Sequence, residues 1–204
     1  MGIVKGPLSA RRYAVSTEVP EFFREQYAEM LNAHAFREPF SKVMKEEVFG
    51  WARHDNLLET DFTDINLWLY NQYALFSIRV DKKSLPANLF RATVEQRCKA
   101  WCVENARENV PRSVKTEIKD QLELEWLQRA LPRVQVTEVV WNIVGGWVLF
   151  HSLSEAANDR FRKHFHRTFG LELHPVNPLE LITDPALAEA LERTGGSDLS
   201  MEPR

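Results

Sequence analysis

Residues 134–150 of the chain, VQVTEVVWNIVGGWVLF, give the clearest indication of its architecture, because their pattern describes two strands joined by a turn. β-Branched and aromatic side chains dominate the run from Val134 to Ile143, and Trp147-Val-Leu-Phe150 forms a second apolar run. The pair Gly145-Gly146 stands between them, and a glycine pair in this position is typical of a tight antiparallel hairpin. We therefore predict an antiparallel sheet with this hairpin as one of its units.

Two long helices are predicted immediately before the hairpin. Ser84-Leu-Pro86 opens a helical region that extends to about Arg107, and Pro111-Arg-Ser113 opens a second one that runs up to Pro132. Proline is compatible with the first turn of a helix and interrupts a helix elsewhere, so it can mark both the starts and the final stop. We predict that this pair, over residues 84–133, projects from the body as a helical arm.

A helix and a short strand are predicted after the hairpin. Ser152 or Ser154 is the candidate N-cap, because a serine oxygen can accept a bond from a free N–H of the first turn. Apolar residues then recur at helical spacing until Gly170, which is a typical C-terminal stop. A final strand is expected over residues 171–176. The apolar line of this helix consists of Ala157, Phe161, Phe165 and Phe169.

The N-terminal half adds further strands and one helix, so strands and helices alternate while the tight hairpins favour antiparallel pairing. This pattern is typical of the α+β class. We predict a single domain over residues 1–182, followed by a C-terminal helix near 186–193 and a flexible polar tail within 183–204. The expected N-terminal elements are a strand over 8–15, a helix from Pro20 to near His34, an aromatic turn at Phe49-Gly50-Trp51, and paired strands over 65–70 and 73–80.

Composition places the chain among globular proteins. Its 204 residues are 44% hydrophobic and 27% charged, with eight glycines and ten prolines, which is unlike disordered or collagenous sequences. No apolar run reaches the roughly 18 residues of a membrane span, and no signal peptide is recognisable at the start. We expect a cytoplasmic protein without membrane contact, in which Cys98 and Cys102 stay reduced.

The chemistry-bearing residues do not form a recognisable catalytic pattern. No glycine-rich phosphate loop, nucleophile elbow or catalytic-cysteine motif is present. His164 and His166 lie two residues apart on a predicted helix and so point in different directions. The acidic residues near Glu117 and Glu125 are interspersed with lysines, as on a solvated helix face. We therefore expect no cofactor, no metal site and no enzymatic activity.

Basic side chains are concentrated in the middle of the chain. Residues 82–135 carry eleven basic and seven acidic side chains, whereas both flanking regions are net acidic. Stripes of like charge at helical spacing suit a surface that follows phosphates, although a solvated face gives the same pattern. A second basic face is expected on the helix from Glu155, which also carries His164. The predicted DNA-binding residues are Lys83, Arg97, Arg107, Arg112, Lys115, Lys119, Arg129, Arg133, Arg160, Lys163 and Arg167.

The second long helix also carries apolar residues around a wide arc. Such a helix must pack on the body on more than one side or be covered by another subunit. A homodimer is the commonest way to cover it. The alternative is a helix enclosed within the monomer. The predicted interface residues are Leu124, Trp126, Leu127 and Leu131, with Leu122 beside them.

Short sequence motifs of one to three residues, called words below, occur in a fixed order, and they make the chain resemble the bacterial recombination-associated RdgC family. The words are individually weak, but their order and spacing cover most of residues 7–182. They also follow the same succession of strands and helices. The matching words are Phe49-Gly50-Trp51, Ser84-Leu85-Pro86, Ile118-Lys119-Asp120, Leu131-Pro132-Arg133, Trp141, Gly146-Trp147-Val148, Ser152-Leu153-Ser154, Phe169-Gly170-Leu171, Pro175-Val176 and Pro178-Leu179.

This resemblance implies a non-enzymatic, nucleoid-associated protein that binds double-stranded DNA without sequence preference. The resemblance also implies a ring-shaped dimer with a positively charged inner surface, which restrains the activity of RecA-type recombinases. Two alternatives stay open: a module of the same fold that binds protein in place of DNA, and a metal-dependent nuclease.

The sequence also departs from the family pattern. The usual Gly-Trp-Val-Pro loop reads Gly50-Trp51-Ala52-Arg53 here, and Val134-Gln135 stands where the family has an aromatic residue after the Leu-Pro-Arg word. The family's C-terminal third has no counterpart in these 204 residues. If that third supplies a dimer contact, the expected outcome is either an open dimer on DNA or a chain that does not encircle DNA at all.

Overall fold

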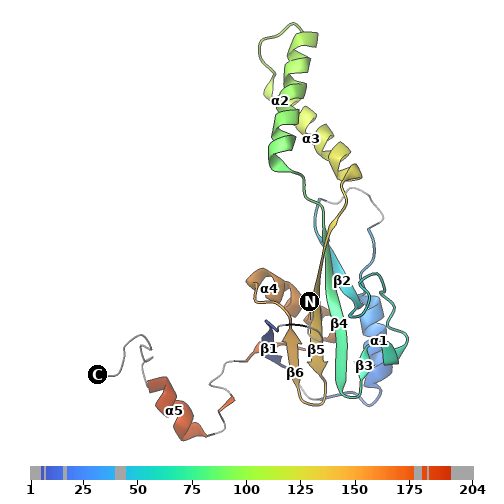
Figure 1. The fold of residues 1–204 in the computed structure, drawn as a ribbon, viewed down its shortest axis with the longest axis vertical. Coiled ribbons are helices and arrows are strands. Elements are labelled where there is room, and N and C mark those ends of the chain that lie inside the picture. The colour runs from blue at the N-terminus through green and yellow to red at the C-terminus, as the bar shows by residue number, and fades with distance from the viewer. Residues whose placement is uncertain are drawn as a thin grey trace.

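An antiparallel sheet forms the centre of the molecule, with a helical pair standing away from it as an arm (Figure 1). The computed structural model describes residues 6, 8–15, 18–39, 45–176, 181–182 and 184–193. The strand order across the sheet is β2-β4-β5-β6-β1-β7, and β3 pairs with β4. The α+β class predicted from the sequence is confirmed. The strands are β1 Arg11–Ala14, β2 Val48–Arg53, β3 Leu69–Tyr70, β4 Tyr73–Lys82, β5 Arg133–Asn142, β6 Trp147–Phe150 and β7 His174–Pro175.

The longest pairing in the sheet joins β4 to β5. It runs from Tyr73 opposite Asn142 to Lys82 opposite Arg133, so all ten residues of each strand are paired. β5 then pairs with β6, which confirms the predicted hairpin. At its turn the Asn142 side chain accepts a 2.7 Å bond from the Gly145 N–H, and Gly146 has a φ of 64°, a left-handed conformation that glycine adopts readily.

Helices α1 (Phe23–Ala33) and α4 (Glu155–Phe169) bury their apolar sides in one core against the sheet. The predicted phenylalanine line of α4 is confirmed, because Phe161 and Phe165 are fully buried and Phe169 is nearly so. Phe161 stacks on Phe150 of β6 with ring centroids 4.2 Å apart. The helix ends at Gly170, whose φ of 70° is left-handed as a C-terminal stop requires.

The predicted arm is an insertion between β4 and β5. It consists of α2 (Ala87–Glu104) and α3 (Arg112–Arg129), which run side by side above the sheet in Figure 1. The two helices bury a small apolar interface that includes Leu122 and Leu127, and the rings of Phe90 and Trp126 meet edge to face at 5.5 Å. The arm therefore has a core of its own.

One predicted element of the N-terminal half is wrong, and another is confirmed only at its end, where Leu69–Tyr70 pairs with β4. The aromatic turn at Phe49-Gly50-Trp51 is part of strand β2, where the pairing of Ala35 with Trp51 places the backbone of Phe36 against Gly50. Close approach of two backbones explains this glycine better than a turn does. The strand expected over 65–70 begins as a short 3-10 helix at Ile65–Leu67, because the Asp64 carboxylate accepts a bond from the Asn66 N–H.

The other boundaries differ less from prediction. The strand expected over 8–15 is β1, and the one expected over 171–176 is the two-residue β7. Ser154 is the N-cap residue of α4, but its side chain makes no capping bond. α5 (Pro185–Arg193) confirms the helix near 186–193, and the tail from Gly195 lies outside the described residues. In the described part of the chain, no helix has the length and apolar character needed to cross a membrane.

His164 contradicts the expectation that α4 carries it on an exposed basic face. Its side chain is buried, and its ring lies 4.5 Å from the ring of Trp51, which in turn donates a 2.8 Å bond to the Thr168 hydroxyl. The buried side of α4 is thus wide enough to include this histidine beside the phenylalanines. Burial lowers the pKa of His164 to about 4, with smaller contributions from the positive charges of His34 and Arg167.

Acid should therefore destabilise the fold through His164. The unfolded chain protonates this residue near pH 6.5 and the folded chain near pH 4, so stability is lost as pH falls through this interval. We expect a loss of roughly 2–3 kcal/mol between pH 7 and pH 4.5, from about 1.4 kcal/mol per pKa unit. Urea unfolding at both pH values measures it. His164→Phe should reduce the loss and exposed His166→Gln should not; equal losses in both variants would contradict this account.

Candidate nucleic-acid interface

The clearest group of free cations lies on α3. Arg112, Lys115 and Lys119 follow one another at spacings of three and four residues, so they line one side of the helix. All three side chains are exposed, and none forms an ion pair with the residues that the structure describes. They form a stripe, here called the α3 stripe, that presents uncompensated positive charge to solvent.

Two other predicted cations of the arm have an acidic partner. Arg97 of α2 donates a 2.6 Å bond to Glu125 of α3, and Arg129 lies 3.6 Å from the same carboxylate. The bond from Arg97 is the main cause that lowers the pKa of Glu125. The bond from Arg97 joins the two helices of the arm, whereas Arg129 is paired with Glu125 within α3, so both cations carry less free charge than the sequence pattern indicated.

At the foot of the arm, Lys119 meets basic residues from two other segments. It lines a hollow of about 320 Å³ together with Lys45, Lys83 and Glu123. Lys83 donates a 2.8 Å bond to the backbone oxygen of Leu127, and Lys45 lies 3.8 Å from the Glu123 carboxylate. Lys45 was not predicted from the sequence, because only the folded chain brings its segment beside α3.

The outer part of the arm has a second hollow, of about 580 Å³, between α2 and α3. Lys115 of the α3 stripe lines it from one side, and Lys99, Cys98 and Cys102 line it from the other. Both cysteines are free thiols. Lys99 was also missed by sequence analysis, because its neighbours along α2 gave no basic pattern. The exposed Arg107 lies in the connection between the two helices.

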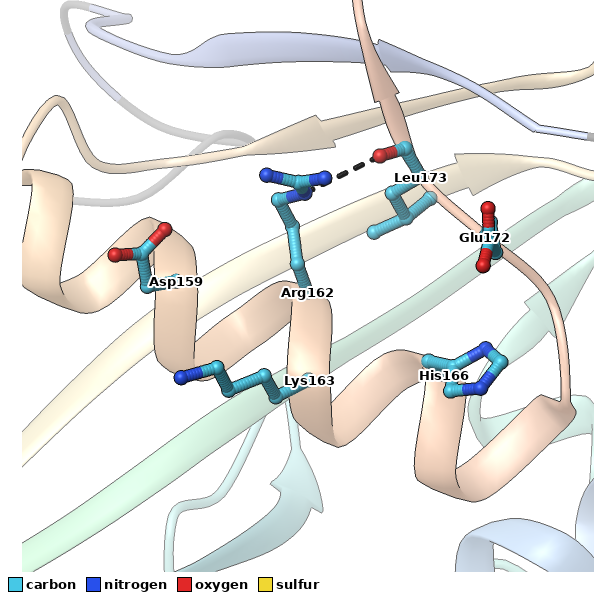
Figure 2. A pocket seen from close by; sticks show the side chains of 6 residues that line it. All are labelled: Asp159, Arg162, Lys163, His166, Glu172 and Leu173. Carbon is cyan, nitrogen blue, oxygen red and sulfur yellow. Dashed lines mark hydrogen bonds between the residues drawn. The ribbon is translucent and has the colours of Figure 1, made fainter.

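The basic residues of α4 do not act as one face. Arg160 donates a 2.9 Å bond to Glu47, so its charge is compensated, whereas Lys163 and Arg167 are exposed. Lys163 lines a hollow of about 280 Å³ beside the segment that follows α4. Figure 2 shows Arg162 donating to the backbone oxygen of Leu173 there, with the carboxylates of Asp159 and Glu172 on either side of it.

Arg133 lies away from the α3 stripe, at the start of β5. It lines a recess of about 610 Å³ between the foot of the arm and α4, which also contains Lys82, Glu47 and Arg160. Lys82 is a further cation that sequence analysis missed. Lys82 reaches the recess because its position in β4 is paired with Arg133 of β5.

The four predicted interface residues have different environments. Leu127 is buried inside the arm, and Trp126 packs on Phe90, so both have partners within the chain. Leu124 is 42% exposed and Leu131 is 89% exposed. Leu124 and Leu131 are therefore the exposed members of this set, while Trp126 is half-buried.

No candidate metal centre is found in the part of the chain that the structure describes. Among those residues, no three or more histidine, cysteine, aspartate or glutamate side chains gather where they could hold an ion. The pair Asp159 and Glu172 is separated by Arg162, as Figure 2 shows. The described geometry thus offers cationic hollows as its candidate sites.

The geometry defines the chain as an antiparallel α+β body with a cationic helical arm inserted between the paired strands β4 and β5. A family model described as "Putative exonuclease, RdgC" matches residues 10–191. The chain belongs to the RdgC family, and the resemblance recognised in the sequence is confirmed.

Curated relatives agree with this assignment. The recombination-associated protein RdgC of Burkholderia ambifaria is 31% identical over 162 residues, covering 77% of this chain and 46% of that protein. The proteins of the same name from Neisseria meningitidis serogroup C and Neisseria gonorrhoeae are 30% identical over 99 residues, covering 47% of this chain and 33% of theirs. The matched part thus spans between a third and about half of these relatives' length.

Proposed function

We propose that this chain is a non-enzymatic protein that binds double-stranded DNA without sequence preference and modulates homologous recombination. The observation that carries the proposal is the α3 stripe, in which exposed cations on a projecting arm have no acidic partner among the described residues. The names of the relatives, recombination-associated proteins, support the biological setting. A RecA-type recombinase is the proposed indirect partner, and the nucleoid is the proposed location.

The spacing of the stripe suits a phosphate backbone. Side chains three or four residues apart on a helix are neighbours at about 5–6 Å, and the seven helical steps from Arg112 to Lys119 rise by about 10 Å. Duplex DNA carries a charge for about every 1.7 Å of its axis, so such a stripe faces several phosphates at once. Contacts of this kind position a protein on the duplex and carry no base information.

Salt dependence tests the proposal. The affinity for random duplex should fall steeply with salt, and replacing Arg112, Lys115 and Lys119 by Ala should weaken all sequences about equally. The slope of log affinity against log salt should decrease by about 0.9 for each phosphate that the variant no longer neutralises. Fluorescence anisotropy at four salt concentrations measures both quantities.

A control in the body separates the effect of the stripe from a general loss of positive charge. Arg24→Ala with Arg37→Ala removes exposed cations of the body, outside the predicted set, and should leave the slope nearly unchanged. A flat salt response of the unmodified chain would argue against phosphate-led binding. It would favour the alternative that the same fold binds a protein partner.

Catalysis is proposed to be absent, although the family model carries the word exonuclease. We expect labelled linear and nicked DNA to stay intact with Mg²⁺ or Mn²⁺, because two-metal hydrolysis needs several carboxylates that converge on the ions. Gel analysis over hours of incubation provides the measurement. Metal-dependent cleavage that disappears in Asp159→Asn or Glu172→Gln would overturn the proposal and point to the hollow in Figure 2.

We further propose that the chain forms a homodimer through the arm. The exposed side chains of Leu124 and Leu131 are the apolar groups that a partner would cover. Leu124→Asp with Leu131→Asp should yield a folded monomer, since neither side chain supports the arm's own core. The control Leu58→Asp changes an exposed leucine of the body. Sedimentation that shows the unmodified chain as a monomer at tens of micromolar would contradict the dimer.

A further inference from the structure

The recess beside the foot of the arm combines charge and shape in a way that the proposed duplex contacts do not use. It has a volume of about 610 Å³, within the usual range of small-ligand sites. The end of the β4–β5 pairing forms one wall, and the start of α4 forms another. Its polar lining includes Lys82, Arg133, Arg160, Glu47, Ser152 and Ser154.

Lys82 and Arg133 are placed unfavourably for the sheet alone. They are directly opposite each other at the last pair of β4 and β5, so their side chains leave the same face. Like charges in this arrangement repel, and neither has an ion-pair partner among the residues the structure describes. An anion between the two cations would turn this repulsion into attraction.

The charge count indicates what kind of anion fits. Arg160 is compensated by Glu47, to which it donates bonds from Nε and a terminal nitrogen. Lys82 and Arg133 then leave two positive charges facing the recess. A phosphodiester carries one negative charge, whereas a phosphomonoester carries between about 1.5 and 2 near pH 7. The monoester is therefore the better match.

Neutral groups in the recess add hydrogen-bond donors. Ser152 and Ser154 line it with hydroxyl groups, and the Ser154 side chain is not used to cap α4. Ala156 and Ala157 of the first helical turn also line the recess. A phosphoryl group bound in the recess would accept hydrogen bonds from the two serine hydroxyl groups, while Lys82 and Arg133 neutralise its charge.

We propose that this recess binds a phosphomonoester, and that the physiological source is the terminal phosphate of a DNA strand. A free mononucleotide has the same chemistry and is the other source. The DNA source rests on the proposed function, because it requires the arm to hold the duplex nearby. Recognition of the monoester itself does not require the arm.

Small-molecule titration tests the recess without DNA. Calorimetry with thymidine 5′-monophosphate should detect binding, and thymidine should give none. Lys82→Gln with Arg133→Gln should weaken the nucleotide at least tenfold, whereas Arg24→Gln with Arg37→Gln should leave it within twofold. Circular dichroism checks that both variants are folded. Absence of nucleotide binding by the unmodified chain, or equal binding by both double variants, would overturn the proposal.

Duplexes with different ends identify the source. The unmodified chain should bind a 5′-phosphorylated duplex about tenfold more tightly than the same duplex with 5′-hydroxyl ends, and Lys82→Gln with Arg133→Gln should remove the preference. Equal affinity for both ends, with nucleotide binding retained, would reject the DNA end and leave a mononucleotide site. Failure to bind any duplex, closed circles included, would reject the proposed function. The nucleotide titration would still show whether the recess binds a phosphomonoester.

Discussion

The ten-residue antiparallel pairing of β4 with β5 is the constraint on which the other features depend. It supplies two internal strands of the sheet, and its aromatic and aliphatic side chains, such as Phe76 and Trp141, meet the phenylalanines of α4 in the core. The same pairing brings the two ends of the arm together and aligns Lys82 with Arg133. The register of β4 against β5 thus determines the core contacts, the position of the arm and the charged lining of the recess.

Sequence patterns predicted the elements whose cause is local. The hairpin at Gly145-Gly146, the two proline-started helices and the phenylalanine line of α4 follow from turn chemistry and helical spacing. The errors arose where a distant segment decides the outcome. Gly50 looked like a turn residue, but it is a strand residue against the backbone of Phe36. His164 looked exposed, but Trp51 from β2 covers it.

The candidate site divides in the same way. The α3 stripe was predictable, because its residues are neighbours on one helix. The partners of Arg97 and Arg160 were not, because Glu125 and Glu47 reach them only in the folded chain. Lys82 was not predicted for the same reason, since its place in the recess depends on its pairing with Arg133. Charge counted along a sequence therefore overstates the free charge of a surface until its ion pairs are known.

The position of the arm has a consequence for how proteins of this architecture can differ in size. The arm leaves the sheet after Lys82 and returns to it at Arg133, and these two residues are paired neighbours. The length of the arm therefore does not change the spacing of the two strands that carry it. Adding one turn to each of α2 and α3 would extend the arm by about 5.4 Å and leave every strand in register. The reach of the cationic stripe is thereby a property that insertions and deletions can tune independently of the body.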